Sequence, residues 1–163
     1  MDTYYDDISE GYEELHREEQ EKKMKIMLSE VSVSPNDELL DVGCGTGITT
    51  VPWNCKRTGA DPARKLLEKA NDKKNVKYVL AQAENLPFRN DSFDIVTSVT
   101  AIQNFDDIKK GLLEIRRVGK KRFALTYLKK SPKAEAIEKL IITIFKVRKR
   151  IEEEKDIIFI CEK

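Results

Sequence analysis

A glycine-rich segment carries the clearest chemical signal in this sequence. It reads Asp41-Val42-Gly43-Cys44-Gly45-Thr46-Gly47 and follows a short apolar run that begins at Glu38. Glycine permits positive φ angles, and it has no β-carbon to keep a ligand away from the backbone. Open α/β folds bind their ligands beyond the carboxyl ends of the strands. The segment therefore predicts a sharp turn, opening a helix, where bare backbone meets a small ligand.

Other interpretations of this glycine turn are weaker. A tight turn without a ligand does not need three glycines at alternate positions. A triphosphate cradle ends in Gly-Lys-Ser/Thr, and this segment does not. The nicotinamide fingerprint G-x-G-x-x-G also fails, because Ile48 stands where its last glycine belongs.

Three more segments follow the glycine turn in an informative order. Gly59-Ala60-Asp61-Pro62 places a carboxylate eighteen residues after Gly43, Ala81 to Phe88 reads AQAENLPF, and Asn90 to Val96 reads NDSFDIV. With the glycine turn, they resemble the class I methyltransferases that use S-adenosylmethionine (SAM), whose motifs include D/E-x-G-x-G-x-G and G-D-A-x-x-L-P-F. The resemblance covers residues 38–118 and is to a small, archaeal-type member.

The resemblance implies SAM as the cofactor and a set of residues around it. In the family the glycine turn packs against the amino-acid end of SAM, and the carboxylate at Asp61 accepts hydrogen bonds from the ribose hydroxyls. Gln82 stands where relatives carry an Asp that binds the adenine amino group, and its side-chain carbonyl can still accept that bond. The expected cofactor-binding residues are Asp41, Gly43, Cys44, Gly45, Gly47, Asp61, Pro62, Gln82, Ala83, Glu84, Ser98, Tyr5 and Tyr12.

The methyl acceptor is expected beside residues 98–105, after the fourth strand. Relatives that methylate exocyclic or amide nitrogens carry D/N-P-P-Y/F there, and its absence disfavours adenine-N6 and glutamine-amide acceptors. Gln103 and Asn104 are catalytic candidates that position the acceptor, or else they cap the helix that begins near Asp106. His16 is a candidate general base, or else a solvated surface histidine.

Methyl transfer from a sulfonium is an in-line displacement in which the cofactor carries the activation. The protein mainly holds the nucleophile and the methyl group in near-attack geometry. A missing acid–base pair therefore does not argue against this reaction.

The elements that position these residues follow from hydrophobic periodicity. Apolar residues at steps of three and four predict an N-terminal helix over 10–31, which we expect to form a lid within residues 1–33. Beyond it, strands and helices alternate through a Rossmann-like core, residues 38–163, in a single domain. The expected strands are 38–42, 57–61, 76–80, 93–99 and 121–128, and the expected helices are a short one over 46–52, then 62–71, 106–117 and 133–143.

The fold class that results is α/β. We expect a doubly wound, mostly parallel seven-stranded sheet with helices on both faces. Two strand-like runs, 145–148 and 157–161, lie too close together for a crossover helix, so they should pair as a C-terminal antiparallel hairpin.

Composition bears on disulfides, metal sites, membrane spans and charged surfaces. The three cysteines lack a CxxC spacing, which argues against disulfides and against a metal site. No apolar stretch is long enough to cross a bilayer, so we expect a cytoplasmic protein without a membrane partner. Charge is uneven: residues 109–150 hold fifteen basic and three acidic side chains, a surface that either contacts phosphates or is simply solvated.

The sequence thus predicts a SAM-dependent methyltransferase whose acceptor is a small molecule or RNA. A scaffold that binds SAM, or a subunit that needs an activating protein partner, is the alternative, motivated by Gln82 and by the short helix after the glycine turn. A nicotinamide-dependent oxidoreductase is a third and weaker one.

Overall fold

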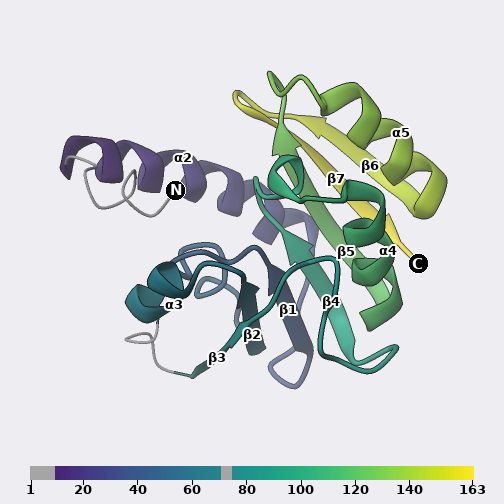
Figure 1. The fold of residues 1–163 in the computed structure, drawn as a ribbon, viewed down its shortest axis with the longest axis horizontal. Helices are drawn as coiled ribbons and strands as arrows, with labels where there is room; N and C mark the ends of the chain where they lie inside the picture. The colour runs from purple at the N-terminus through teal and green to yellow at the C-terminus, as the bar shows by residue number, and fades with distance from the viewer. Residues whose placement is uncertain (1–9, 71–74) are drawn as a thin grey trace.

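A single twisted sheet organises the molecule. The computed structural model describes residues 10–70 and 75–163, with side chains from residue 14 onward, so Tyr5 lies outside the described residues (Figure 1). The strand order is β3-β2-β1-β4-β5-β7-β6. The strands are β1 (Glu38–Val42), β2 (Lys56–Asp61), β3 (Val76–Leu80), β4 (Phe93–Ser98), β5 (Gly119–Leu128), β6 (Lys146–Glu152) and β7 (Asp156–Glu162).

The direction of the strands confirms the predicted fold class. The five strands from β3 to β5 pair in parallel, and β7 then pairs antiparallel with both β5 and β6. Parallel neighbours place the carboxyl ends of β1, β2 and β4 at one edge of the sheet, where Asp41 pairs with both Gly59 and Thr97. Polar residues that follow these three strands are therefore brought together.

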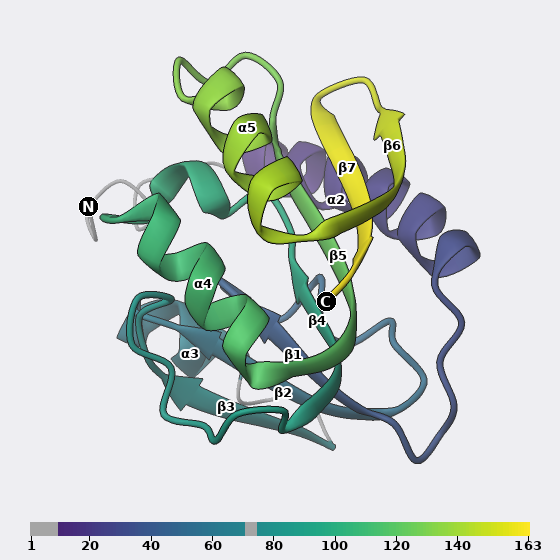
Figure 2. The same cartoon turned by 90° about the vertical axis from the view of Figure 1, so that its right-hand side faces the viewer.

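Helices cover both faces of the sheet, as predicted. Figure 2 shows α4 and α5 in front of the sheet and α2 behind it. The helices are α2 (Glu10–Glu30), α3 (Arg64–Ala70), the 3-10 helix η1 (Ile102–Asn104), α4 (Ile108–Val118) and α5 (Ala134–Ile144). Alternation along the strands feeds two cores: Leu40 and Val96 face α4, whereas their neighbours Leu39 and Ile95 face α2.

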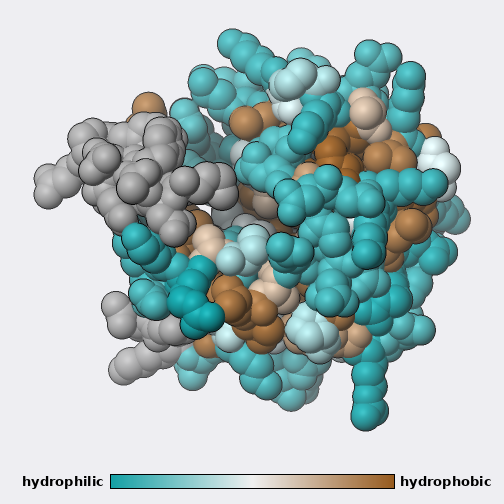
Figure 3. All heavy atoms as spheres, in the orientation of Figure 1, coloured by the Kyte–Doolittle hydropathy of each residue, from teal (hydrophilic) through white to brown (hydrophobic). Residues whose placement is uncertain are grey.

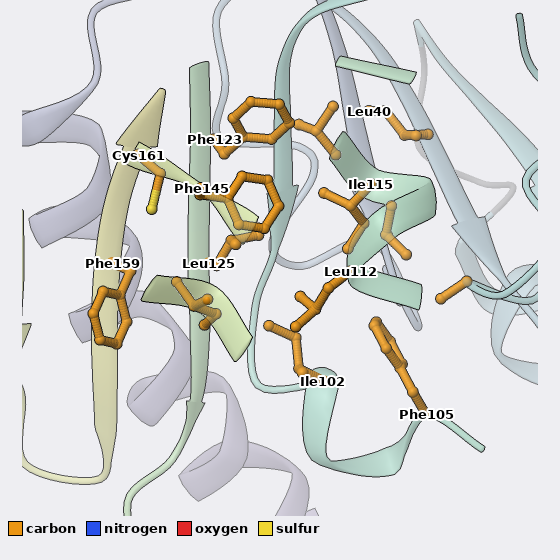
Figure 4. Packing of buried hydrophobic residues seen from close by; sticks show 14 of the residues in the cluster. Leu40, Ile102, Phe105, Leu112, Ile115, Phe123, Leu125, Phe145, Phe159 and Cys161 are labelled. Atoms are coloured by element: carbon orange, nitrogen blue, oxygen red, sulfur yellow. The ribbon is translucent and has the colours of Figure 1, made fainter. Parts of the chain in front are cut away.

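The larger core lies under α4 and α5. Figure 4 shows side chains from the sheet, among them Phe123 and Leu125, meeting Leu112 and Ile115 of α4 and Ile102 of η1. Leu112, Ile115 and Ile102 are completely buried. Burying side chains of this size contributes about 2 kcal/mol each, so this cluster fixes α4 and η1 against the end of β4.

Most element boundaries agree with the sequence-based expectation within about two residues. The chief exception follows the glycine turn, where we predicted a short helix over 46–52. Residues 45–52 instead form consecutive turns, with Gly47 O accepting from both Thr50 N at 3.1 Å and Val51 N at 3.0 Å. Pro52 has no N–H to extend that single turn. The indole of Trp53, almost fully buried, packs in the same core as Met24 and Met27 of α2.

Two further boundaries differ. β6 continues to Glu152, four residues past the predicted run 145–148. The helix α3 begins at Arg64 rather than at Pro62, because Asp61 still belongs to β2 and Pro62 lies in the bend that follows it.

The visible surface is dominated by polar side chains, with apolar ones in small patches between them (Figure 3). Within residues 10–70 and 75–163, no helix combines the length and apolar character needed to cross a membrane.

Candidate functional site

The glycine turn bends the backbone through conformations that favour glycine. Gly43, Gly45 and Gly47 have φ angles of 78°, 55° and 85°. The N–H groups of Gly43 and Cys44 both donate to Ala60 O, at 2.7 and 3.1 Å, so the turn is tied to the end of β2. A side chain at these φ values would be strained, which explains why the segment alternates glycine.

Asp41 anchors the turn from beneath. Its carboxylate is completely buried and accepts hydrogen bonds from the hydroxyls of Thr49 (2.7 Å), Thr50 (2.7 Å) and Thr97 (3.0 Å). Burial raises the pKa of Asp41 to about 6, against the opposing effect of these three hydrogen bonds. The side chain thus faces the turn and β4, and it holds the returning chain of residues 47–53 in place.

Asp61 lies on the other side of the turn. Its Oδ2 accepts from Gly45 N at 2.9 Å, and its Oδ1 accepts from Ala63 N at 2.8 Å. Burial raises the pKa of Asp61, and the two backbone N–H groups act in the opposite direction. Each carboxylate oxygen has a second lone pair, so both can still accept a hydrogen bond from a ligand.

The glycines differ in the space that a side chain would meet. A β-carbon at Gly43 would lie 2.5 Å from Ala101 Cβ, and one at Gly59 would lie 2.8 Å from Cys44 Sγ. At Gly45 the nearest heavy atom, Leu66 Cδ1, would be 3.9 Å away. Gly43 and Gly59 therefore allow neighbouring segments to pack, whereas Gly45 has free space around its α-carbon beside the Asp61 carboxylate.

The segment after β3 forms a fixed loop beside this opening. Gln82 is exposed, Ala83 is buried, and Glu84 Oε2 accepts from Asp107 N at the start of α4, at 2.9 Å. Arg117 spans the loop by donating to Leu86 O (3.0 Å) and Phe88 O (2.8 Å). Its hydrogen bond to Glu114 lowers the pKa of that carboxyl, and Glu114 in turn accepts from Leu86 N.

Residues 98–104 form the segment after β4 that packs against the glycine turn, and we call this segment the wall. Ser98 is completely buried and donates to Val42 O at 2.8 Å, so it supports the turn from below. Gln103 is 9% exposed: its Nε2 donates to Thr100 O (2.9 Å) and its Oε1 accepts from Leu128 N (3.4 Å). Asn104 is exposed. Neither residue caps α4, because Asp107 does so by accepting from Lys110 N.

His16, the predicted general base, lies on an exposed part of α2. Desolvation and the charge of Lys23 lower the pKa of His16, while Glu19 raises it. A lowered pKa favours the neutral imidazole, which is the form that accepts a proton. The side chain of Tyr12, like Tyr5, lies outside the described residues.

A hollow of about 410 Å³ lies at the other end of the strands. It is lined by the first residues of β1, β2 and β3, including Glu38, Lys56 and Val76. None of the predicted site residues lines it. Among the described residues, no group of three His, Cys, Asp or Glu side chains could hold a metal ion.

Sequence reasoning missed two features of the site. The threonines that bind Asp41 were not singled out, although two of them follow Gly47 by only two and three residues. A buried pair between Lys23 and Asp156 was also missed. Its signal was Lys23 itself, which falls at helical spacing among the buried residues Gln20, Met24 and Met27.

Known proteins resemble the chain over this same region. The family described as the methyltransferase domain matches residues 40–124. The uncharacterized methyltransferase YcgJ of Bacillus subtilis is 31% identical over 127 residues, which cover 69% of this chain and 50% of that protein. The chain spans roughly half the length of the curated relatives it matches.

Two solved structures share the fold at low identity. A SAM-dependent methyltransferase from Aquifex aeolicus superposes with a TM-score of 0.72 at 18% identity, over 85% of this chain and 88% of that one. A putative methyltransferase from Haloferax volcanii, solved in complex with the Trm112 methyltransferase activator, gives 0.77 at 16% identity, over 94% of each chain.

Proposed function

This chain belongs to the class I SAM-dependent methyltransferase family, and from that premise we propose that it transfers a methyl group from SAM to a small molecule or an RNA. The observation that carries the proposal is the open backbone at Gly45 beside the Asp61 carboxylate. Bare backbone and a carboxylate with free lone pairs suit a ligand that joins an amino acid to a ribose.

The residues around the turn divide the cofactor between them. Gly43, Gly45 and Gly47 would face its amino-acid end, and Asp61 would accept hydrogen bonds from the ribose hydroxyls. Gln82, exposed at the end of β3, would accept one from the adenine amino group. Asp41 and Ser98 act on the cofactor through the turn that they hold, since both are completely buried.

When bound, SAM supplies a methyl group already activated by its sulfonium. The chain then has to exclude water and align the acceptor. Asn104, exposed on η1, would contact the acceptor directly, whereas Gln103 would act by holding Thr100 and the end of β5. His16, with a pKa held low, would accept a proton from an acceptor that needs deprotonation.

The class of acceptor is tested by following labelled methyl groups. Purified protein with methyl-labelled SAM would be added to total RNA, protein and metabolite fractions from the source organism. Label in the RNA or the metabolite fraction supports the proposal, and label confined to metabolites excludes RNA. No transfer to any fraction, from a protein that binds SAM, favours a subunit without activity of its own.

That alternative is motivated by the exposed Gln82 and by residues 45–52, which form turns where a short helix was predicted. A protein built this way could bind SAM and depend on a partner, as the Haloferax volcanii neighbour is bound to an activator. Adding clarified extract from the source to the inactive protein distinguishes the cases. Activity that appears only with extract, and only when the chain itself is present, supports partner activation.

A further inference from the structure

A buried ion pair connects helix α2 to strand β7. Lys23 Nζ of α2 lies 3.1 Å from Asp156 Oδ1 at the start of β7, and the two side chains are 3% and 0% exposed. Its neighbour Lys22 pairs with Glu154 at 3.7 Å, but those side chains are 65% and 68% exposed. Two pairs therefore connect α2 to the β6–β7 hairpin, one in the interior and one in solvent.

The buried pair converges on Thr100, which follows β4. Thr100 has a φ angle of 55°, a conformation that a β-branched residue rarely adopts. Its hydroxyl accepts from Lys23 Nζ at 2.8 Å and donates to Asp156 Oδ2 at 2.7 Å. Its N–H donates to Thr126 Oγ1 at 2.8 Å, and its carbonyl accepts from Gln103. Every polar atom of a strained residue is thus held.

The conformation of Thr100 sets the position of the wall that faces the glycine turn. Ala101 comes next, and its Cβ fills the space in which a Gly43 side chain would stand, 2.5 Å from the position of that Cβ. Gln103 then closes η1 back onto Thr100 O. A displaced Thr100 would therefore move the residues that separate the cofactor turn from the acceptor.

We propose that Lys23 and Asp156 are positioning residues, which hold Thr100 and so build the acceptor wall only when α2 is docked. The role at the acceptor rests on the proposed function, whereas the holding of Thr100 does not. A buried ion pair contributes little net stability, and apolar residues of similar size often replace one without loss. The pair is thus better explained by the arrangement it fixes than by the energy it adds.

The critical variant removes both charges together. Lys23→Met alone would leave the Asp156 carboxylate buried without its counter-ion and could unfold the protein. The double variant Lys23→Met/Asp156→Leu avoids that penalty but leaves the hydroxyls of Thr100 and Thr126 without their shared acceptor, so we expect its midpoint of thermal unfolding to fall by a few degrees while unfolding stays cooperative. Lys22→Met is the matched control, because it breaks the exposed pair between α2 and Glu154 of the same hairpin.

Amide hydrogen exchange measures the wall directly and needs no cofactor. We expect the Thr100 amide of the double variant to accelerate at least tenfold more than the amides of β1 and β2 do. In Lys22→Met, both sets of amides should keep their wild-type rates. The single tryptophan, Trp53, packs with Met24 and Met27, so acrylamide quenching of its fluorescence shows separately whether α2 stays docked. An unchanged Thr100 amide, or equal acceleration throughout the sheet, would overturn the proposal.

A kinetic comparison separates this proposal from the proposed function. In the double variant, affinity for S-adenosylhomocysteine should stay within threefold of wild type, while methyl transfer to the labelled fraction falls at least tenfold. A double variant that transfers methyl at the wild-type rate contradicts the role at the acceptor. If the wild type transfers no methyl to any fraction, the proposed function fails, and the exchange result still decides whether the pair holds Thr100.

Discussion

Two carboxylates flank the glycine turn, and their surroundings give them different tasks. Asp41 is completely buried under three threonine hydroxyls, whereas Asp61 keeps 7% of its surface and binds two backbone N–H groups. Both were expected at the cofactor from sequence alone. The resemblance gave the ribose hydroxyls to Asp61, but it did not predict the burial of Asp41, because the threonines that enclose that carboxylate come from the turn and from β4.

Asp41 should make stability depend on pH. Its pKa is raised to about 6 in the folded protein, so the native state holds this proton more tightly than the unfolded chain does. Its stabilising effect is complete below about pH 4 and is lost as the pH rises through about 6, a change of about 3 kcal/mol in the free energy of unfolding. Urea unfolding between pH 4 and 7 would measure it.

Asp41→Asn removes that titration, so the difference between wild type and variant should change across this pH range. Asp106→Asn, at an exposed carboxylate, is the control and should follow the wild type. Parallel curves for wild type and Asp41→Asn would show that Asp41 does not titrate there.

Two glycines offer a contrast between folding and binding. Gly59→Ala places a methyl group 2.8 Å from Cys44 Sγ and 3.0 Å from Tyr78 Cδ1, so it should destabilise the fold by about 1–3 kcal/mol. Gly45→Ala meets open space, and its cost is mainly that of a positive φ, about 1 kcal/mol. We expect Gly45→Ala to lose more affinity for S-adenosylhomocysteine than Gly59→Ala, although Gly59→Ala unfolds at lower denaturant. The reverse order would mean that the ligand does not approach Gly45.

At the scale of elements, periodicity predicted the strands, α2, α4 and α5, since each buries one face of a regular repeat. Periodicity failed over residues 46–52, where a segment this short fits either a helix or a series of turns. Trp53 packs in the same core as residues of α2. This contact joins segments far apart in the chain, so the local pattern of apolar residues does not reveal it. For the same reason the partner of Lys23, 133 residues away on β7, was not predictable.

The loop that carries Gln82 should depend on Arg117. Its planar guanidinium donates to two carbonyls of the loop and to Asn90, a fork that a lysine cannot reproduce. Arg117→Lys should therefore weaken S-adenosylhomocysteine binding several-fold while the unfolding midpoint changes little, because the side chain is 32% exposed. Calorimetry compares it with Arg116→Lys, its neighbour on α4. Equal affinities in the two variants would show that the loop does not contact the ligand.

At the scale of the whole molecule, the sheet order and the charge distribution point to different conclusions. The order β3-β2-β1-β4-β5-β7-β6 was predictable as a fold class, because alternation and the closing hairpin leave few topologies. The basic stretch over 109–150 is less available than its composition suggested. Arg148, Lys149 and Arg150 of β6 pair with Glu162, Glu30 and Glu138.

These pairings lead to a prediction about RNA. Three cations of β6 are already paired with glutamates, so they contribute less to binding phosphates. A steep fall of RNA affinity with salt would therefore require the cations of α4. We expect Lys109→Glu/Lys110→Glu to weaken any RNA binding more than Arg148→Glu does. Fluorescence anisotropy at two salt concentrations would measure the affinities. A larger loss in Arg148→Glu would place the RNA on β6.

The central claim is that a SAM-type ligand binds against the Gly45 backbone and the Asp61 carboxylate, which are hydrogen-bonded to each other. Calorimetric titration of S-adenosylhomocysteine into wild type and Asp61→Ala tests it most directly, with Asp106→Ala as the control. We predict one site in wild type, an unchanged control, and a loss in Asp61→Ala of about 1–3 kcal/mol, roughly fivefold to 150-fold in Kd. Equal Kd values for wild type and Asp61→Ala, or no binding at millimolar ligand, would contradict the account.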